Sequence, residues 1–84
     1  MADVKIYLTD HCPYCDSAKE LLTRKNVTFS EIRVDLDPEE RAKMMELSGR
    51  RTVPQIFIND KPIGGFDDLA ALNDSGELDK LLTE

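Results

Sequence analysis

Hydrophobic residues follow two different periods along this chain, and the two periods alternate. Val4, Ile6 and Leu8 occupy every second position, as in a strand with one buried face. The next segment repeats apolar residues three and four positions apart, as on the buried side of a helix. In chain order, the pattern predicts a strand at 4–8, a helix at 13–25, a strand at 27–34, a helix at 38–48, strands at 55–58 and 61–64, a helix at 67–73 and a short helix at 78–82.

Local signals mark where several of these helices begin and end. Pro13 and Pro38 suit the first position of a helix, where the missing N–H removes no hydrogen bond. Asp37 is placed to cap the second helix. Gly49 is the expected stop of that helix, and Gly76 separates the last two helices.

The element order β-α-β-α-β-β-α-α predicts an α/β fold in which helices flank a four-stranded mixed sheet. A strand–helix–strand opening requires a right-handed crossover, so the first two strands should be parallel. Asn59 and Asp60 form a tight turn that returns the chain antiparallel, and Pro62 places the last strand at an edge. With 84 residues, we expect a single domain over 1–84.

Charge and hydropathy narrow the range of partners and compartments. The net charge of −6 disfavours binding to nucleic acid or to anionic membranes, because both need clustered Lys and Arg. No apolar run approaches the roughly 20 residues that span a bilayer, and the first residues lack the pattern of a signal peptide. We therefore expect a cytoplasmic protein and, because no long apolar segment is exposed, a monomer.

Cys12 and Cys15 stand between the first predicted strand and the first predicted helix. A thiol at a helix N-terminus faces unpaired N–H groups and the positive end of the helix dipole. Such a site lowers the thiol pKa from about 8.5 to between about 3.5 and 7, and only the thiolate attacks a disulfide. The second cysteine, one turn later, is placed to resolve the mixed disulfide. This pattern favours redox chemistry.

Three other interpretations of the cysteine pair remain open. A structural disulfide across so short a loop would stabilise the fold by only roughly 2 kcal/mol and rarely persists in the cytosol. A zinc site needs four ligands, whereas the chain offers one Cys pair and the adjacent His11. Alternatively, two buried thiols could simply pack in the core.

Three separated segments together resemble the glutaredoxin family. The residues at 12–15 (Cys-Pro-Tyr-Cys) are similar to the active site of dithiol glutaredoxins, those at 52–54 (Thr-Val-Pro) to their cis-proline loop, and those at 64–68 (Gly-Gly-Phe-Asp-Asp) to their glutathione loop. The resemblance covers the whole chain and is nearest to short bacterial-type glutaredoxins. It implies a thioredoxin fold and a cis bond before Pro54.

The resemblance also implies the activity, a glutathione-dependent thiol–disulfide oxidoreductase in electron transport and redox homeostasis. Cys12 would be the nucleophile and Cys15 the resolving thiol, with glutathione as co-substrate and no metal. Expected partners are glutathionylated proteins and protein disulfides, with ribonucleotide reductase among them. The residues expected to contact glutathione are Tyr14, Arg41, Thr52, Val53, Pro54, Gly65, Phe66, Asp67 and Asp68.

Two departures from the family pattern change these expectations. Thr9 stands where many members carry lysine, which removes a cation and should weaken glutathione binding. Phe66 stands where a third cysteine is common. Two rival functions remain open. In the first, two chains hold an iron–sulfur cluster between them through Cys12. In the second, the protein is a thioredoxin-like electron donor.

Overall fold

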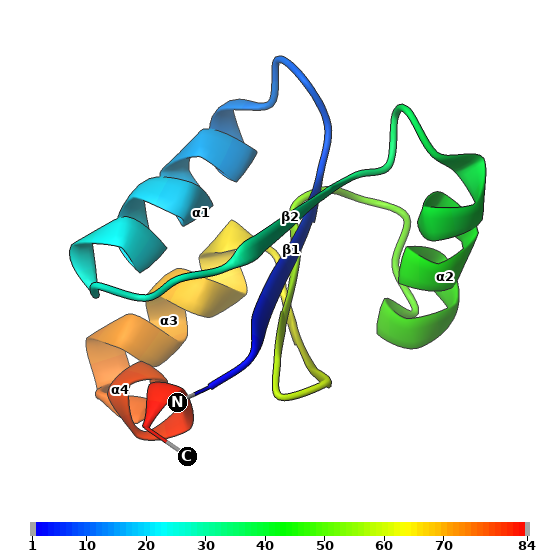
Figure 1. The fold of residues 1–84 in the computed structure, drawn as a ribbon. Coiled ribbons are helices and arrows are strands. Elements are labelled where there is room, and N and C mark those ends of the chain that lie inside the picture. The colour runs from blue at the N-terminus through cyan, green and yellow to red at the C-terminus, as the bar shows by residue number, and fades with distance from the viewer. Residues whose placement is uncertain (1, 84) are drawn as a thin grey trace.

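The computed structural model describes residues 2–83 and arranges them as one sheet with helices on both faces (Figure 1). The elements are β1 (Val4–Leu8), α1 (Pro13–Arg24), β2 (Ser30–Arg33), α2 (Pro38–Ser48), β3 (Gln55–Ile58), β4 (Lys61–Gly64), α3 (Phe66–Ser75) and α4 (Glu77–Leu82). This order confirms the predicted sequence of strands and helices.

The sheet has the strand order β2-β1-β3-β4. β1 pairs in parallel with β2 and antiparallel with β3, so Ile6 lies between Glu31 on one side and Ile56 on the other. β4 pairs antiparallel with β3 alone and forms an edge, as Pro62 predicted. The parallel crossover through α1 places the end of β1 and the start of α1 at the same end of the sheet.

Two hydrophobic clusters lie on the two faces of the sheet. The larger one joins alternate residues of β1 and β3 to α1, α3 and α4, and it includes Val4, Ile6, Leu8, Leu22, Ile56, Ile58, Leu69 and Leu78. The smaller one holds α2 through Met44, which packs with Tyr7, Val34 and Phe57. Figure 1 shows this asymmetry, with α1 and α3 on one face and α2 on the other.

The second strand is shorter than the predicted 27–34. Asn26 adopts a left-handed conformation with φ 58°, and the Val27 N–H donates to the Leu22 carbonyl oxygen at 3.2 Å. The chain is therefore still closing the end of α1 at these positions, and pairing with β1 starts only at Ser30. α3 is also longer than predicted, since it begins at Phe66 and ends at Ser75.

The predicted limits of α2 are confirmed. The Asp37 carboxylate accepts hydrogen bonds from the Glu39 and Glu40 N–H groups at 3.1 and 3.3 Å, and Gly49 ends the helix with φ 72°. Leu47, an apolar residue of this helix, is 51% exposed. Within the described residues, no helix combines the length and hydropathy needed to cross a membrane.

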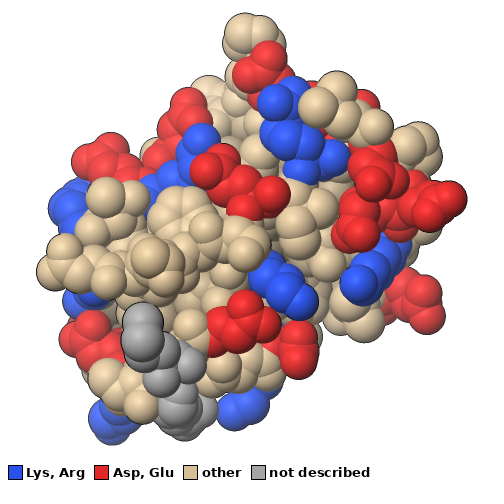
Figure 2. All heavy atoms as spheres, in the orientation of Figure 1, with Lys and Arg blue, Asp and Glu red and all other residues tan. Residues whose placement is uncertain are grey.

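Basic side chains do not gather into one patch on the face that Figure 2 presents. Lys and Arg side chains lie between Asp and Glu side chains there. Ion pairs between such side chains in the structure include Arg24–Glu20 and Lys19–Glu31. On this face, negatively charged side chains are therefore interspersed with positively charged ones.

Candidate active site

The two cysteines lie at the start of α1, where the chain leaves β1. Cys12 is the N-cap residue with φ −115° and ψ 101°, and Pro13 takes the first helical position. Cys12 and Cys15 form a disulfide with a Cα–Cα distance of 5.1 Å. Cys15 is 1% exposed and packs in the larger cluster, whereas Cys12 is only partly buried. Of the two cysteines, Cys12 is therefore the more accessible residue.

The electrostatic surroundings of Cys12 favour a negative charge on its sulfur. The Cys15 N–H donates to Cys12 Sγ at 3.1 Å, and the positive end of the α1 dipole points in the same direction. Asp16 in the first turn opposes this effect, but its carboxylate is mostly exposed and lies 3.7 Å from Lys19 Nζ. The helix N-terminus and the N–H donor both stabilise negative charge on sulfur, so these surroundings favour the thiolate form of Cys12.

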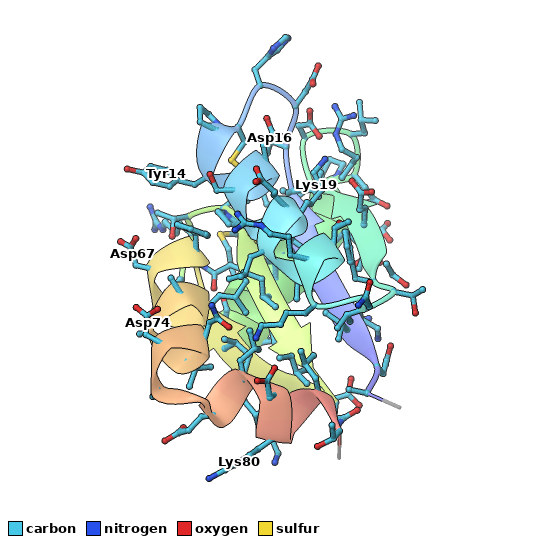
Figure 3. The ribbon with its side chains drawn as sticks, turned by 90° about the vertical axis from the view of Figure 1, so that its left-hand side faces the viewer. Tyr14, Asp16, Lys19, Asp67, Asp74 and Lys80 are labelled. Atoms are coloured by element: carbon cyan, nitrogen blue, oxygen red, sulfur yellow. A yellow bond between two sulfur atoms is a disulfide. The ribbon has the colours of Figure 1, made fainter. Side chains whose placement is uncertain are left out.

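Beside the cysteine pair lies a groove of about 260 Å³. It is lined by Tyr14, Arg50, Thr52, Val53, Pro54, Gly65, Phe66, Asp67 and Asp68. The rings of Tyr14 and Phe66 lie 6.4 Å apart at 31°, and Figure 3 shows Tyr14 and Asp67 on the same side of the molecule. Every residue predicted to contact glutathione lies here except Arg41, and the Val53–Pro54 bond is cis, as expected.

One basic residue of the groove was missed by the sequence analysis. Arg50 Nη1 donates to Asp68 Oδ2 at 2.8 Å, and the same carboxylate accepts from the Gly65 N–H at 3.0 Å. The guanidinium beside it, and then the N–H, hold the pKa of the Asp68 carboxyl below its ordinary value. The available signal was the Arg-Arg pair directly before Thr52, whose contact across to α3 cannot be inferred from spacing.

Gly64 allows this contact to form. Its φ is +114°, a conformation that residues with a side chain rarely adopt. A Cβ at this position would collide with the Asp68 carboxylate and lie 3.0 Å from Arg50 Nη1. The backbone therefore passes Asp68 at a distance that only glycine permits.

Two residues considered from the sequence lie elsewhere. Arg41 does not line the groove, and its Nη2 donates to the Arg51 carbonyl oxygen at 3.4 Å. The His11 side chain is 94% exposed, and its Nε2 lies 3.4 Å from Asp10 Oδ2. Within residues 2–83, no three His, Cys, Asp or Glu side chains converge as metal ligands would.

The comparison that decides the family concerns most of the chain. The profile of the glutaredoxin family matches residues 4–63, which include the cysteine pair, both central strands and the cis-proline loop. The chain belongs to the glutaredoxin family. Glutaredoxin 3 of Escherichia coli K12 is 52% identical over 82 residues, which cover 98% of this chain and 99% of that protein.

Solved glutaredoxins superpose on the whole fold. The solution structure of glutaredoxin from Brucella melitensis is 56% identical and gives a TM-score of 0.86, covering 98% of this chain and 89% of that one. A crystal structure of a buckwheat glutaredoxin–glutathione complex is 28% identical with a TM-score of 0.90, covering 98% of this chain and 77% of that one. The expected fold and activity, a glutathione-dependent thiol–disulfide oxidoreductase with a redox-active cysteine pair, are confirmed.

Proposed function

We propose that Cys12 attacks disulfides while glutathione occupies the adjacent groove, and that Cys15 resolves protein mixed disulfides. The observation that carries this proposal is the position of Cys12, the more accessible residue of a disulfide at the start of α1, next to a groove lined by Tyr14 of the same motif. The buckwheat relative was crystallised with glutathione, which supports the choice of ligand.

The reaction with a glutathionylated protein needs only Cys12. Its thiolate attacks the glutathione sulfur of the mixed disulfide, that bond breaks, and the target protein leaves as a thiolate that takes up a proton. Glutathione is now bonded to Cys12. The thiolate of a second glutathione attacks the sulfur of the bound one, which releases glutathione disulfide and restores the Cys12 thiolate.

A protein disulfide requires both cysteines. Cys12 attacks one sulfur of the target, and the other sulfur leaves as a thiol. The Cys15 thiolate then attacks Cys12 Sγ, which releases the reduced target and leaves the Cys12–Cys15 disulfide seen in the structure. Two glutathione molecules reduce this disulfide in turn and leave as glutathione disulfide.

In this proposal, different groups of the groove bind the cysteinyl and the γ-glutamyl parts of glutathione. The main chain of Val53 pairs with the cysteinyl residue as an added strand would. At the start of α3, the Phe66 and Asp67 N–H groups precede the first helical hydrogen bonds and receive the γ-glutamyl carboxylate. Asp68 binds the γ-glutamyl amine, and Tyr14 lies along the peptide.

Further parts of the proposal concern context. Glutathionylated proteins and protein disulfides are the substrates, and ribonucleotide reductase is one target of the chemistry. The protein acts as a cytoplasmic monomer whose single domain covers 1–84. These statements are supported by the membership of the chain in the glutaredoxin family.

The test compares the two cysteines as a matched pair. Turnover of a glutathionylated peptide, with glutathione as reductant, is measured for the unmodified chain, for Cys12→Ser and for Cys15→Ser. Cys15→Ser should retain turnover because the glutathione route does not use Cys15, whereas Cys12→Ser should retain none. Both variants should lose reduction of a protein disulfide substrate.

Two results would contradict the proposal. Turnover by Cys12→Ser would remove Cys12 as the nucleophile. No turnover by the unmodified chain, combined with disulfide reduction when a flavin-dependent thioredoxin reductase replaces glutathione, would show that the groove is not a glutathione site.

A further inference from the structure

Gln55 is a buried polar residue next to the groove but not part of its lining. It is the first residue of β3, directly after Pro54, and pairs with Tyr7 of β1. Its side chain is among the largest that are fully buried, with 1% exposure for the residue. Among the residues that the structure describes, Gln55 is the only buried one with a polar or charged side chain, so packing alone does not account for an amide here.

The Gln55 amide makes its hydrogen bonds to one residue. Nε2 donates to the Thr52 carbonyl oxygen at 2.9 Å and to Thr52 Oγ1 at 3.2 Å. Because a carbonyl oxygen only accepts, the nitrogen of the amide must face Thr52, and this fixes the orientation of the group. The other end, Oε1, is buried and has no partner among the described residues.

An amide at this buried position is less favourable for packing than an apolar side chain of similar size. A buried acceptor without a donor is unfavourable, and an apolar side chain of similar size would avoid the cost. The benefit lies in the segment that Gln55 holds. Thr52, Val53 and Pro54 belong to no helix or strand, and the Gln55 amide closes this segment by bonding back to its first residue.

We propose that Gln55 is a positioning residue, whose amide anchors Thr52 so that the Val53 main chain stays in place along the groove. The inference rests on the proposed function, in which Val53 pairs with the cysteinyl part of glutathione. Gln55 does not touch the ligand. It reduces the freedom that the Val53 segment would otherwise lose on binding, so its effect falls on affinity rather than on the sulfur chemistry.

The experiment uses Gln55→Met, which keeps the length of the side chain and removes both polar ends. We expect KM for a glutathionylated peptide to rise about ten-fold, as for one lost hydrogen bond, while kcat stays within about two-fold. Alkylation of reduced Cys12 by iodoacetamide should keep its rate, because the start of α1 is unchanged. The melting temperature should not fall, because the unpaired acceptor is also removed.

Ile58→Val provides the matched control on the same strand. Ile58 is buried in the larger cluster at the other end of β3, so this variant lowers the melting temperature and leaves KM unchanged. A rise in KM for Gln55→Met no greater than that for Ile58→Val would overturn the inference. If the unmodified chain turns over the peptide normally in that experiment, the proposed function stands and only the role of Gln55 fails.

A second measurement needs no variant. In the unmodified protein, the two Gln55 side-chain amide protons are followed by hydrogen exchange with NMR detection. Anchoring to the Thr52 carbonyl predicts slow exchange of these protons, both with and without bound S-methylglutathione. Rapid exchange of both Gln55 protons would overturn the anchor even if Gln55→Met does not fold.

Discussion

The cysteine pair and the groove beside it are constructed from different kinds of groups. In the pair, the reactive atoms belong to side chains, and the local sequence from Cys12 to Cys15 contains everything that positions them. In the groove, main-chain groups of residues 52–54 and 65–67 supply many of the proposed contacts. The ion pair between Arg50 and Asp68, which are distant in sequence, and the bond from Gln55 back to Thr52 hold the groove in shape.

This difference separates two kinds of kinetic effect. Changes in the cysteine pair should alter the chemical step, and therefore kcat, because they affect the attacking sulfur. Changes in the groove should alter KM, because they affect contacts that glutathione makes before and during the reaction. Variants of the groove that change kcat alone would show that the two parts are not separable.

The largest effect within the groove is expected from Gly64→Ala. The new Cβ collides with the Asp68 carboxylate at a backbone position with φ +114°, so both the Arg50 pair and the Gly65 contact must shift. We expect KM for a glutathionylated peptide to rise at least about ten-fold. The measurement is steady-state kinetics beside thermal unfolding of the same sample.

Gly49→Ala is the control for backbone strain. Gly49 also has a positive φ, +72°, but a Cβ there meets nothing within 4 Å. It should lose stability of about 1–2 kcal/mol from the left-handed conformation and keep its KM. Equal increases in KM for the two glycine variants would show that general destabilisation, and not the Asp68 contact, limits binding.

A smaller effect is expected from Arg50→Gln. Glutathione carries two carboxylates and one amine, and Arg50 is the only cationic residue among the described residues that line the groove. Its loss also leaves Asp68 with the Gly65 N–H as its remaining donor there. We expect KM to rise about three-fold at neutral pH, while the exposed pair variant Arg24→Gln leaves KM unchanged.

The pH dependence of the same variant sharpens the test. Arg50 lowers the pKa of Asp68, so the charged carboxylate stabilises the fold above the ordinary Asp pKa of about 4, and that contribution is lost as the pH falls through the lowered value. In Arg50→Gln the Asp68 pKa rises toward its ordinary value. The dissociation constant of S-methylglutathione, measured from pH 7 to pH 3, should therefore increase at a higher pH in the variant. If the dissociation constant depends on pH in the same way in both proteins, Arg50 does not act on binding through the pKa of Asp68.

Arg41→Ala is expected to have the smallest effect. The contact between Arg41 and glutathione stays a prediction, because this exposed side chain bonds to the Arg51 carbonyl outside the groove lining. We expect KM to rise no more than about two-fold at low salt and to return to normal at high salt. Lys43→Ala on the same helix is the control, and equal effects of the two variants would remove Arg41 from the site.

Much of the fold was predictable because each element carries a local signal. The apolar alternation of β1, the Asp37-Pro38 start of α2 and the glycine at its end all act through neighbours in sequence. The limits of β2 were not predictable in this way. Its late start depends on the Val27 N–H still closing the end of α1, which apolar content alone does not reveal.

The residues of the site differ in the same way in whether the sequence predicts them. Cys12, Cys15 and the residues at 52–54 and 64–68 stand in contiguous motifs, and the structure brings these motifs together. The role of Arg50 depends on its contact with Asp68, and the role of Gln55 on its contact with Thr52. The spacing of these residues in the sequence does not specify either partner. Folding decides between Arg41 and Arg50, which are equally basic in sequence, by placing only Arg50 along the groove.

Phe66 packs beside Tyr14, with the ring centroids 6.4 Å apart. The sequence contains two cysteines, and both belong to the redox pair. Any reagent that labels thiols on the intact chain therefore reports only on the redox state of the Cys12–Cys15 pair. A gel shift or a mass increment after alkylation directly counts oxidised and reduced active sites in a mixture, without mutating a background cysteine first.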